Sequence, residues 1–277
     1  MSSPPIGYDA FALLTAQRSH TSGPLAELVP WFTKQENLEN EVRLREDPDH
    51  RNPALEAIRE ALTRFLSALP HADYKNPRIS RLGVHGQANP EGSLVFEKNG
   101  QPLAIQQLSD GEQVLLLTVM EQARRLVEAW PDADNPIDQQ GILLIDEVAL
   151  HLHPSWQRAA LPALRETFPG VQIIATTHSP QVMASVPTAS IQVLDNFQLH
   201  KAPVPVYGRD SNAILEELLE VPERPQAIKE ALDRVSQHID DEDLAAAQQA
   251  LDKLKEQLSS QDGEVVRLQT VLDFLAS

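Results

Sequence analysis

The chain has 277 residues, of which 23 are Lys or Arg and 40 are Asp or Glu, so its formal net charge is −17. This excess of acid opposes nucleic-acid binding over the surface as a whole, because phosphate contacts depend on Lys and Arg. The sequence contains no cysteine, which excludes disulfides and thiolate nucleophiles. It also has no apolar run of 18 residues, which excludes transmembrane helices. Because it shows no secretion signal either, a cytoplasmic protein without membrane contact is predicted.

The amino-terminal segment, residues 1–70, is predicted to form a helical arm. Apolar residues recur at helical spacing from Leu25 to Arg45, and Pro30 is expected to kink or break this pattern. Pro53 suits the first position of a second helix, which extends to about Leu69 and has one apolar face.

Residues 71–209 are predicted to form the core of an α/β domain. Two β-type runs flank Asn99-Gly100, which predicts a hairpin because a type I′ turn needs positive φ at both central residues. Strands and helices then alternate, which predicts a mainly parallel sheet with helices on its faces. The expected helices cover 111–130, 154–168 and 179–184, and the expected strands cover 79–84, 93–98, 101–105, 142–146, 171–177 and 191–194.

The last segment, residues 210–277, is predicted to be a helical tail. It holds 16 acidic and 6 basic residues, so it supplies no basic surface for nucleic acid. Pro222 and Pro225 separate a short helix from three further helices, expected at about 226–238, 242–259 and 263–276. The acids of 240–243 are read as a solvated loop and a helix start.

The strongest chemical signal is the run Gly141–Glu147. Its four consecutive aliphatic residues predict a strand buried on both faces, and Asp146 and Glu147 follow at the carboxyl end, where open α/β sheets bind ligands. This is a Walker B pattern, in which Asp146 would hold Mg²⁺ and Glu147 would orient or deprotonate the attacking water. The alternative is a core strand that ends in solvated acids.

Two further segments extend this pattern. In Leu108–Gln113, Ser109 can cap a helix and Gly111 would allow the backbone to approach a phosphate at the helix amino terminus. The alternative for this loop is a plain capping box between Ser109 and Glu112. Downstream, His178 ends another apolar strand, at the same sheet edge as the acids, and fits a γ-phosphate sensor. Alone, such a histidine is more often structural or merely exposed.

In this order the segments resemble the signature loop, Walker B strand, D-loop and switch histidine of the ABC ATPase superfamily. Val148–Pro154 stands where the D-loop should be, and its His-Leu-His-Pro ending is similar to AAA family members akin to SMC, RecF and OLD-type proteins. The resemblance to the bacterial "predicted ATP-binding protein" group covers about residues 24–277 and is firmest over 93–195. It also includes 31–32, 36–41, 97–100, 208–212 and 221–225.

The resemblance implies a P-loop-NTPase-like head that closes with a second head on two ATP molecules and Mg²⁺. It assigns Ser109, Gly111 and Gln113 to nucleotide binding, with the γ-phosphate bound in trans. The implied cis residues are Asp146 for Mg²⁺, Glu147 for catalysis and His178 for catalysis or sensing. His151 and His153 are expected at the head–head interface. A zinc site formed by His151, His153 and His178 is a weaker alternative, because nothing supplies a fourth ligand.

The sequence contains no G-x-x-x-x-G-K-[ST] motif. The head is therefore expected to be incomplete, as a truncated gene product, a fragment or one piece of a split ATPase. The strand leading into the P-loop is expected to pair beside the Walker B strand, so its loss would expose apolar edges. Alone, the chain is expected to hydrolyse ATP weakly or not at all.

The leading hypothesis is thus an ABC/SMC-like ATPase polypeptide that depends on an outside P-loop, supplied by a second head or another polypeptide. The alternative is a non-catalytic interaction module of a DNA-repair or phage-defence assembly. By family resemblance an effector nuclease is a possible partner, while a DNA substrate is not readable from the sequence. A nuclease built into the tail is disfavoured, because the last segment is short and poor in strands.

Overall fold

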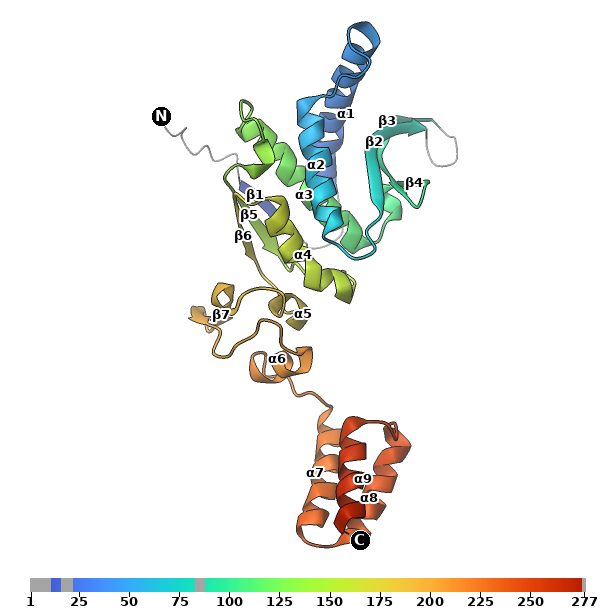
Figure 1. Cartoon of the computed structure of the whole chain (residues 1–277), viewed down its shortest axis with the longest axis vertical. Helices are drawn as coiled ribbons and strands as arrows, with labels where there is room; N and C mark the ends of the chain where they lie inside the picture. The colour runs from blue at the N-terminus through green and yellow to red at the C-terminus, as the bar shows by residue number, and fades with distance from the viewer. Residues whose placement is uncertain (1–10, 16–21, 83–87, 276–277) are drawn as a thin grey trace. The chain divides into compact units, whose positions relative to one another are not determined.

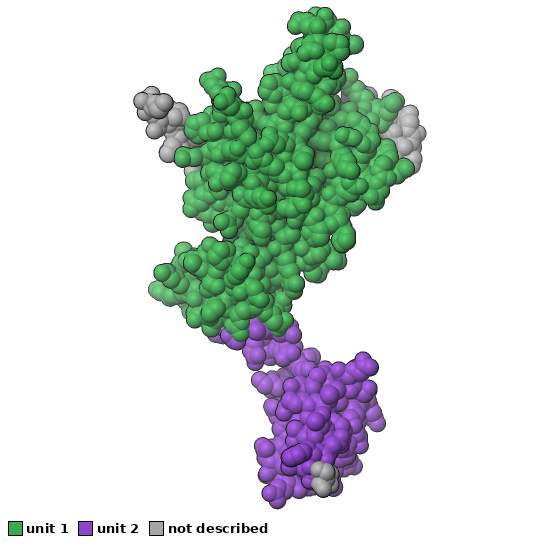
Figure 2. Space-filling view, in the orientation of Figure 1, with its two compact units in different colours: residues 1–211 green, residues 212–277 purple. Residues whose placement is uncertain are grey.

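The computed structural model describes residues 11–15, 22–82 and 88–275, and it divides into two compact units, residues 1–211 and 212–277. Figure 2 colours the two units separately. The predicted helical arm is not a unit of its own, because its helices share one apolar core with the rest of the first unit. None of the helices in the described ranges is long and apolar enough to cross a membrane.

A three-stranded parallel sheet holds the Walker B pattern (Figure 1). Strand β5 (Gly141–Asp146) lies between β1 (Phe11–Thr15) and β6 (Val171–Ala175), and in the β5–β6 register Leu144 faces Ile174. Both edges of β5 are therefore occupied. Among the described residues, the open edges of this sheet lie instead at its two outer strands, β1 and β6.

The other strands form antiparallel sheets, so the expected mainly parallel sheet is only partly observed. Strands β2 (Tyr74–Leu82), β3 (Ala88–Lys98) and β4 (Gln101–Ala104) form one sheet, and β7 (Gln192–Asp195) pairs with β8 (Gln198–Lys201). The predicted turn between β3 and β4 is confirmed, since Asn99 and Gly100 both have positive φ. Strand β7 does not extend the parallel sheet, because a tight turn at Asn196 and Phe197 folds the chain back into β8.

The first unit contains five of the helices seen in the described chain. They are α1 (Ser22–Arg45), α2 (Pro53–Ser67), α3 (Asp110–Ala129), α4 (Pro154–Thr167) and α5 (Pro180–Met183). Pro30 lies inside α1 without ending it. Asn52 caps α2, because its Oδ1 accepts from the amides of Ala54 and Leu55 at 2.9 and 3.3 Å.

The main core packs helices against one face of the parallel sheet. Leu143 and Ile145 of β5 are buried there with residues of α2, α3 and α4. Burial of β5 on both faces was expected, but Leu144 is only half-buried and its register partner Ile174 is 52% exposed. That prediction was wrong for the second face, since the described helices cover only the first.

The second unit is a three-helix bundle preceded by α6 (Ser211–Glu217). Its helices α7 (Gln226–Asp240), α8 (Leu244–Gln257) and α9 (Gly263–Leu275) bury a small apolar core of Val235, Ala247, Leu251, Leu254, Val265, Leu268 and Leu272. Asp243 caps α8 by accepting from the Ala246 amide at 3.0 Å. Arg224 forms a paired contact with Asp262 at 3.0 and 3.1 Å, which ties the segment before α7 to the start of α9.

Candidate functional site

The acids at the end of β5 are held by a residue that sequence reasoning missed. The hydroxyl of Thr176, just after β6, donates to Asp146 Oδ1 at 2.6 Å and accepts from the Glu147 amide at 2.8 Å. Backbone bonds from the Thr176 amide to Ile145 and from the Val148 amide to Thr176 extend the pairing beyond the strands. A polar residue two positions before His178, at a strand end, was the available signal. Thr176 thus fixes the Asp146 carboxylate and the backbone at Glu147.

The imidazole of His178 lies beside these acids. Its Nε2 is 3.4 Å from Glu147 Oε1, and the ring is 87% exposed to solvent. Glu147 has a φ of +52°, a left-handed conformation that is costly for a residue with a side chain. The expected convergence of Asp146, Glu147 and His178 at one sheet edge is therefore observed.

The donor set fits Mg²⁺ better than zinc. Mg²⁺ is commonly bound by one or two carboxylates together with substrate phosphates, and Asp146 is the carboxylate of this site predicted to be such a ligand. Among the residues whose placement is described, no group of three or more His, Asp or Glu side chains is arranged to hold a metal ion. His151, His153 and His178 are thus not gathered into a zinc site.

In the signature-like loop, the capping box that was weighed as an alternative is formed. The amide and hydroxyl of Ser109 each donate to Glu112 Oε2 at 2.9 Å, and the Glu112 amide donates back to Ser109 Oγ at 3.4 Å. Gln113 is buried, and its Nε2 donates to the Leu108 carbonyl at 2.8 Å. Gln113 therefore braces the loop, and its contact with a nucleotide stays a prediction.

Gly111 is approached by the chain's own backbone. A Cβ added there would lie 2.5 Å from the carbonyl oxygen of His151, which has a φ of +60°. The glycine thus allows the start of α3 to pack directly against the D-loop-like segment. Its predicted approach to a phosphate remains untested.

The D-loop-like segment is in turn tied to the turn that follows His178. Gln157 on α4 donates to the Leu152 carbonyl at 3.0 Å and accepts from the Ser179 hydroxyl at 2.7 Å. His153 caps α4, with its Nδ1 accepting from the Ser155 amide at 3.3 Å, and it is exposed, as is His151. The segments carrying the predicted site residues therefore form one connected structure.

Comparison with known proteins places the chain in a family. The family described as "AAA domain, putative AbiEii toxin, Type IV TA system" matches residues 14–184, more than half of the chain. The chain belongs to this AAA-domain family.

Relatives of this AAA-domain chain come from bacteria. It is 38% identical to the "Retron Ec83 probable ATPase" of Escherichia coli over 77% of this chain and 40% of that protein. It is 35% identical to the "Retron Vc95 probable ATPase" of Vibrio cholerae over 61% of this chain and 31% of that protein. The "Septu protein PtuA" of Bacillus mycoides is 33% identical over 32% of this chain and 12% of its own length. The chain thus spans well under half of these curated relatives.

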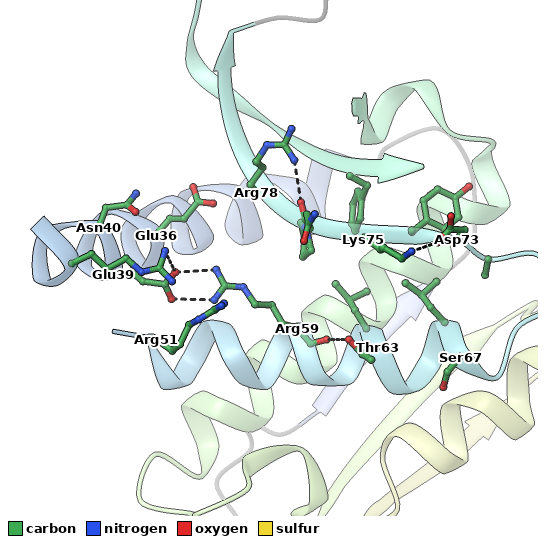
Figure 3. Close-up of a pocket in the computed structure, with 18 residues that line it drawn as sticks. Glu36, Glu39, Asn40, Arg51, Arg59, Thr63, Ser67, Asp73, Lys75 and Arg78 are labelled. Atoms are coloured by element: carbon green, nitrogen blue, oxygen red, sulfur yellow. Dashed lines mark hydrogen bonds and ion pairs between the residues drawn. The ribbon is translucent and has the colours of Figure 1, made fainter. Parts of the chain in front are cut away.

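Away from the acids, the AAA-domain chain has a cleft of about 610 Å³ between α1, α2 and β2 (Figure 3). Five basic and three acidic side chains line it, in contrast to the acidic chain as a whole: Arg43, Arg51, Arg59, Lys75, Arg78, Glu36, Glu39 and Asp73. None of the predicted site residues lines this cleft.

Two acids of the cleft, Glu36 and Glu39, dock α1 on its neighbours. Glu39, whose side chain is 1% exposed, pairs with both terminal nitrogens of Arg59 at 3.0 and 3.1 Å and with Arg43 at 3.0 Å. Burial would raise the pKa of Glu39, but the bonds from Arg59 and from a backbone amide outweigh it and lower the pKa. Glu36 accepts from the Ile79 amide of β2 at 3.2 Å, and burial raises its pKa. Most of the charged side chains that line the cleft therefore form ion pairs with one another or with neighbouring residues.

Proposed function

We propose that this chain carries the signature loop, Walker B acids, D-loop and switch histidine of an ABC-type ATPase head. The observation that carries the proposal is the arrangement at the sheet edge, where Thr176 bonds the Asp146 carboxylate and the Glu147 amide, and Glu147 Oε1 lies 3.4 Å from His178 Nε2. Glu147 also has a positive φ, a conformation that its surroundings must hold in place.

In this proposal the residues divide the work of ATP hydrolysis. Glu147 orients the attacking water and takes its proton, the water oxygen forms a bond to the γ-phosphorus, and the bond to the ADP oxygen breaks. His178 donates to a γ-phosphate oxygen and, through Glu147, senses whether that phosphate is present. Asp146 binds Mg²⁺, which neutralises charge on the phosphate oxygens when bound.

We further propose that two heads close on ATP, with Ser109 and Gly111 acting on nucleotide bound mainly by the facing head. His151 and His153 would lie at the head–head interface. Both histidines are exposed, and the close contact of His151 with Gly111 would make the D-loop and the signature loop move together. Gln113 would keep the loop in shape through its bond to Leu108.

ATP turnover in this proposal needs a P-loop that the 277-residue sequence does not contain. The side of β6 is the favoured place for it. Strands β1 and β6 both end this sheet in the described residues, and β6 is favoured because its Ile174 exposes an apolar side chain. An unpaired edge beside exposed apolar surface is suited to the addition of another strand.

The biological setting is proposed from the relatives. Their names, which contain "Retron", "Septu" and "probable ATPase", support an ATPase role in a defence system. The family resemblance adds an effector nuclease as the partner whose activity the ATPase would govern.

Phosphate release from Mg-ATP tests the catalytic proposal. The chain alone should show little turnover, and adding a polypeptide that carries the family's P-loop segment should produce turnover that Glu147→Gln abolishes. Glu256→Gln, which changes an exposed acid on α8, is the matched control and should leave turnover intact. Turnover that survives Glu147→Gln would refute the assigned site, and robust hydrolysis by the chain alone would refute the need for an outside P-loop.

A non-catalytic interaction module is the second candidate. It is favoured by the signature-like loop itself, in which the Ser109 hydroxyl is bonded to Glu112 and the space beside Gly111 is filled by His151. Isothermal titration with Mg-ATP separates the two. If no ATP binds with the P-loop polypeptide present while the two polypeptides still associate, the interaction module is the correct assignment.

A further inference from the structure

A single carboxylate joins two strands of the antiparallel sheet to the start of α3. Glu112 Oε1 accepts from the Tyr74 hydroxyl at 2.5 Å and from Lys98 Nζ at 3.0 Å. Its other oxygen, Oε2, accepts from the amide and hydroxyl of Ser109, both at 2.9 Å. A capping box needs only the bonds between the Ser109 amide and the Glu112 carboxylate and between the Glu112 amide and Ser109 Oγ, so the contacts from Tyr74 and Lys98 are an addition to it.

The two added donors are themselves held in place. Tyr74 is 4% exposed and packs edge-on against Phe96, with ring centres 6.3 Å apart and ring planes at 83°. Lys98 ends β3, where its Nζ donates to the Tyr74 oxygen at 2.5 Å and lies 4.6 Å from the centre of the ring. The direction of the Glu112 carboxylate is therefore set by the antiparallel sheet as well as by α3.

The charges of the network explain why Lys98 matters at this helix end. A helix amino terminus attracts anions, but Asp110 and Glu112 place two carboxylates in the first turn of α3. Burial would raise the pKa of Glu112, yet bonds from Tyr74, Ser109 and Lys98 lower it to about 2, so the group is ionised at neutral pH. Burial and the bond to Glu112 raise the pKa of Tyr74 to about 12, so Tyr74 remains a donor. Lys98 compensates the charge of Glu112 locally.

We propose that Tyr74 and Lys98 are positioning residues for the signature-like loop, acting on Ser109 through Glu112. This inference rests on the proposed function, in which Ser109 contacts the γ-phosphate bound by a facing head. A hydroxyl has one proton, and that of Ser109 is donated to Glu112, so it must exchange partners to donate to a phosphate. Lys98 and Tyr74 share the Glu112 carboxylate with Ser109. They therefore weaken the hold of Glu112 on the Ser109 proton and reduce the repulsion between Glu112 and the nucleotide.

Hydrogen exchange on the chain by itself tests the positioning. In Lys98→Met and Tyr74→Phe, the amides of residues 109–113 should exchange about threefold faster or more, since each variant removes a bond that holds Glu112. Lys98→Arg should keep the wild-type rate. Lys75→Met is the matched control, because Lys75 lies on the same sheet and forms its ion pair with the exposed Asp73 instead of Glu112. Unchanged exchange at 109–113 in both test variants, or an equal rise throughout α2 and α4, overturns the proposal.

Turnover with the P-loop-bearing polypeptide tests the consequence for nucleotide. Lys98→Met should raise KM for ATP about fivefold, as one uncompensated charge near the phosphates would, with kcat within about twofold of wild type. Lys98→Arg should restore KM. An unchanged KM in Lys98→Met, measured where the wild-type pair is active, overturns the role of Lys98. Absence of turnover in the wild-type pair counts against the proposed ATPase, and the exchange rates still decide whether Tyr74 and Lys98 position the loop.

Discussion

Replacing Gly111 with alanine would push two backbone segments apart. The new Cβ would lie 2.5 Å from the His151 carbonyl oxygen and 2.9 Å from its carbonyl carbon, and both atoms belong to backbone that cannot rotate away. Ordinary contact starts at 3.4 Å, so the segments must separate by about 0.9 Å. Overpacking of this kind costs about 1–3 kcal/mol, and the better helix propensity of alanine returns about 0.5–1 kcal/mol. We expect a net loss of about 1–2 kcal/mol in the free energy of unfolding of the first unit.

Calorimetry and hydrogen exchange measure this effect. The unfolding transition of the first unit should fall by about 2–8 °C, and amides of residues 149–152 should exchange faster. Gly263→Ala is the control, since a Cβ at Gly263 meets nothing within 4 Å and its φ is not positive. It should be neutral or slightly stabilising. If Gly111→Ala is as stable as wild type and leaves exchange at 149–152 unchanged, the proposed packing of α3 on the D-loop-like segment is wrong.

Three other predictions follow from the described contacts. The pKa of Glu112 is lowered to about 2, so its contribution to stability is present above pH 4.5 and is lost as pH falls toward 2. In urea unfolding across this range, the free energies of unfolding of wild type and Glu112→Gln should converge at low pH. Thr176→Val removes the bonds to Asp146 and the following amide and should cost about 1–3 kcal/mol by urea unfolding, whereas Thr176→Ser should cost little. Arg59→Met leaves the buried Glu39 with fewer partners and should lower the free energy of unfolding by about 3 kcal/mol, with Arg59→Lys intermediate. A loss below about 0.5 kcal/mol, which is typical of surface changes, would show that the pair is not structural.

The local features of the chain were predictable because they depend on neighbours in sequence. The Asn99-Gly100 turn needs only two residues that tolerate positive φ, and both have it. The helices of the tail follow from apolar spacing and from caps such as Asp243. The shared sheet edge of Asp146 and His178 also followed, since parallel strands place their carboxyl ends together.

Assignments that depended on distant partners were less predictable. The runs around β2 and β7 read correctly as strands, but the sheets that they join depend on which edges the rest of the chain leaves open. Burial of the second face of β5 was expected from its aliphatic run, yet Ile174 beside it is exposed because no described helix covers that face. Propensity describes what a segment can bury, and packing decides what actually covers it.

The sequence by itself determined most of the helices, the placement of Asp146, Glu147 and His178 at one sheet edge, and the capping potential of Ser109 with Glu112, but it did not predict strands β1 and β8. Only the tertiary structure decided that Thr176 clamps the acids, that His151 fills the space beside Gly111, and that the antiparallel sheet reaches Glu112. The physical reason is the separation in sequence over which each interaction acts. Periodicity, turns and strand direction act over a few residues, whereas contacts between residues 30 to 40 positions apart exist only once whole elements have packed.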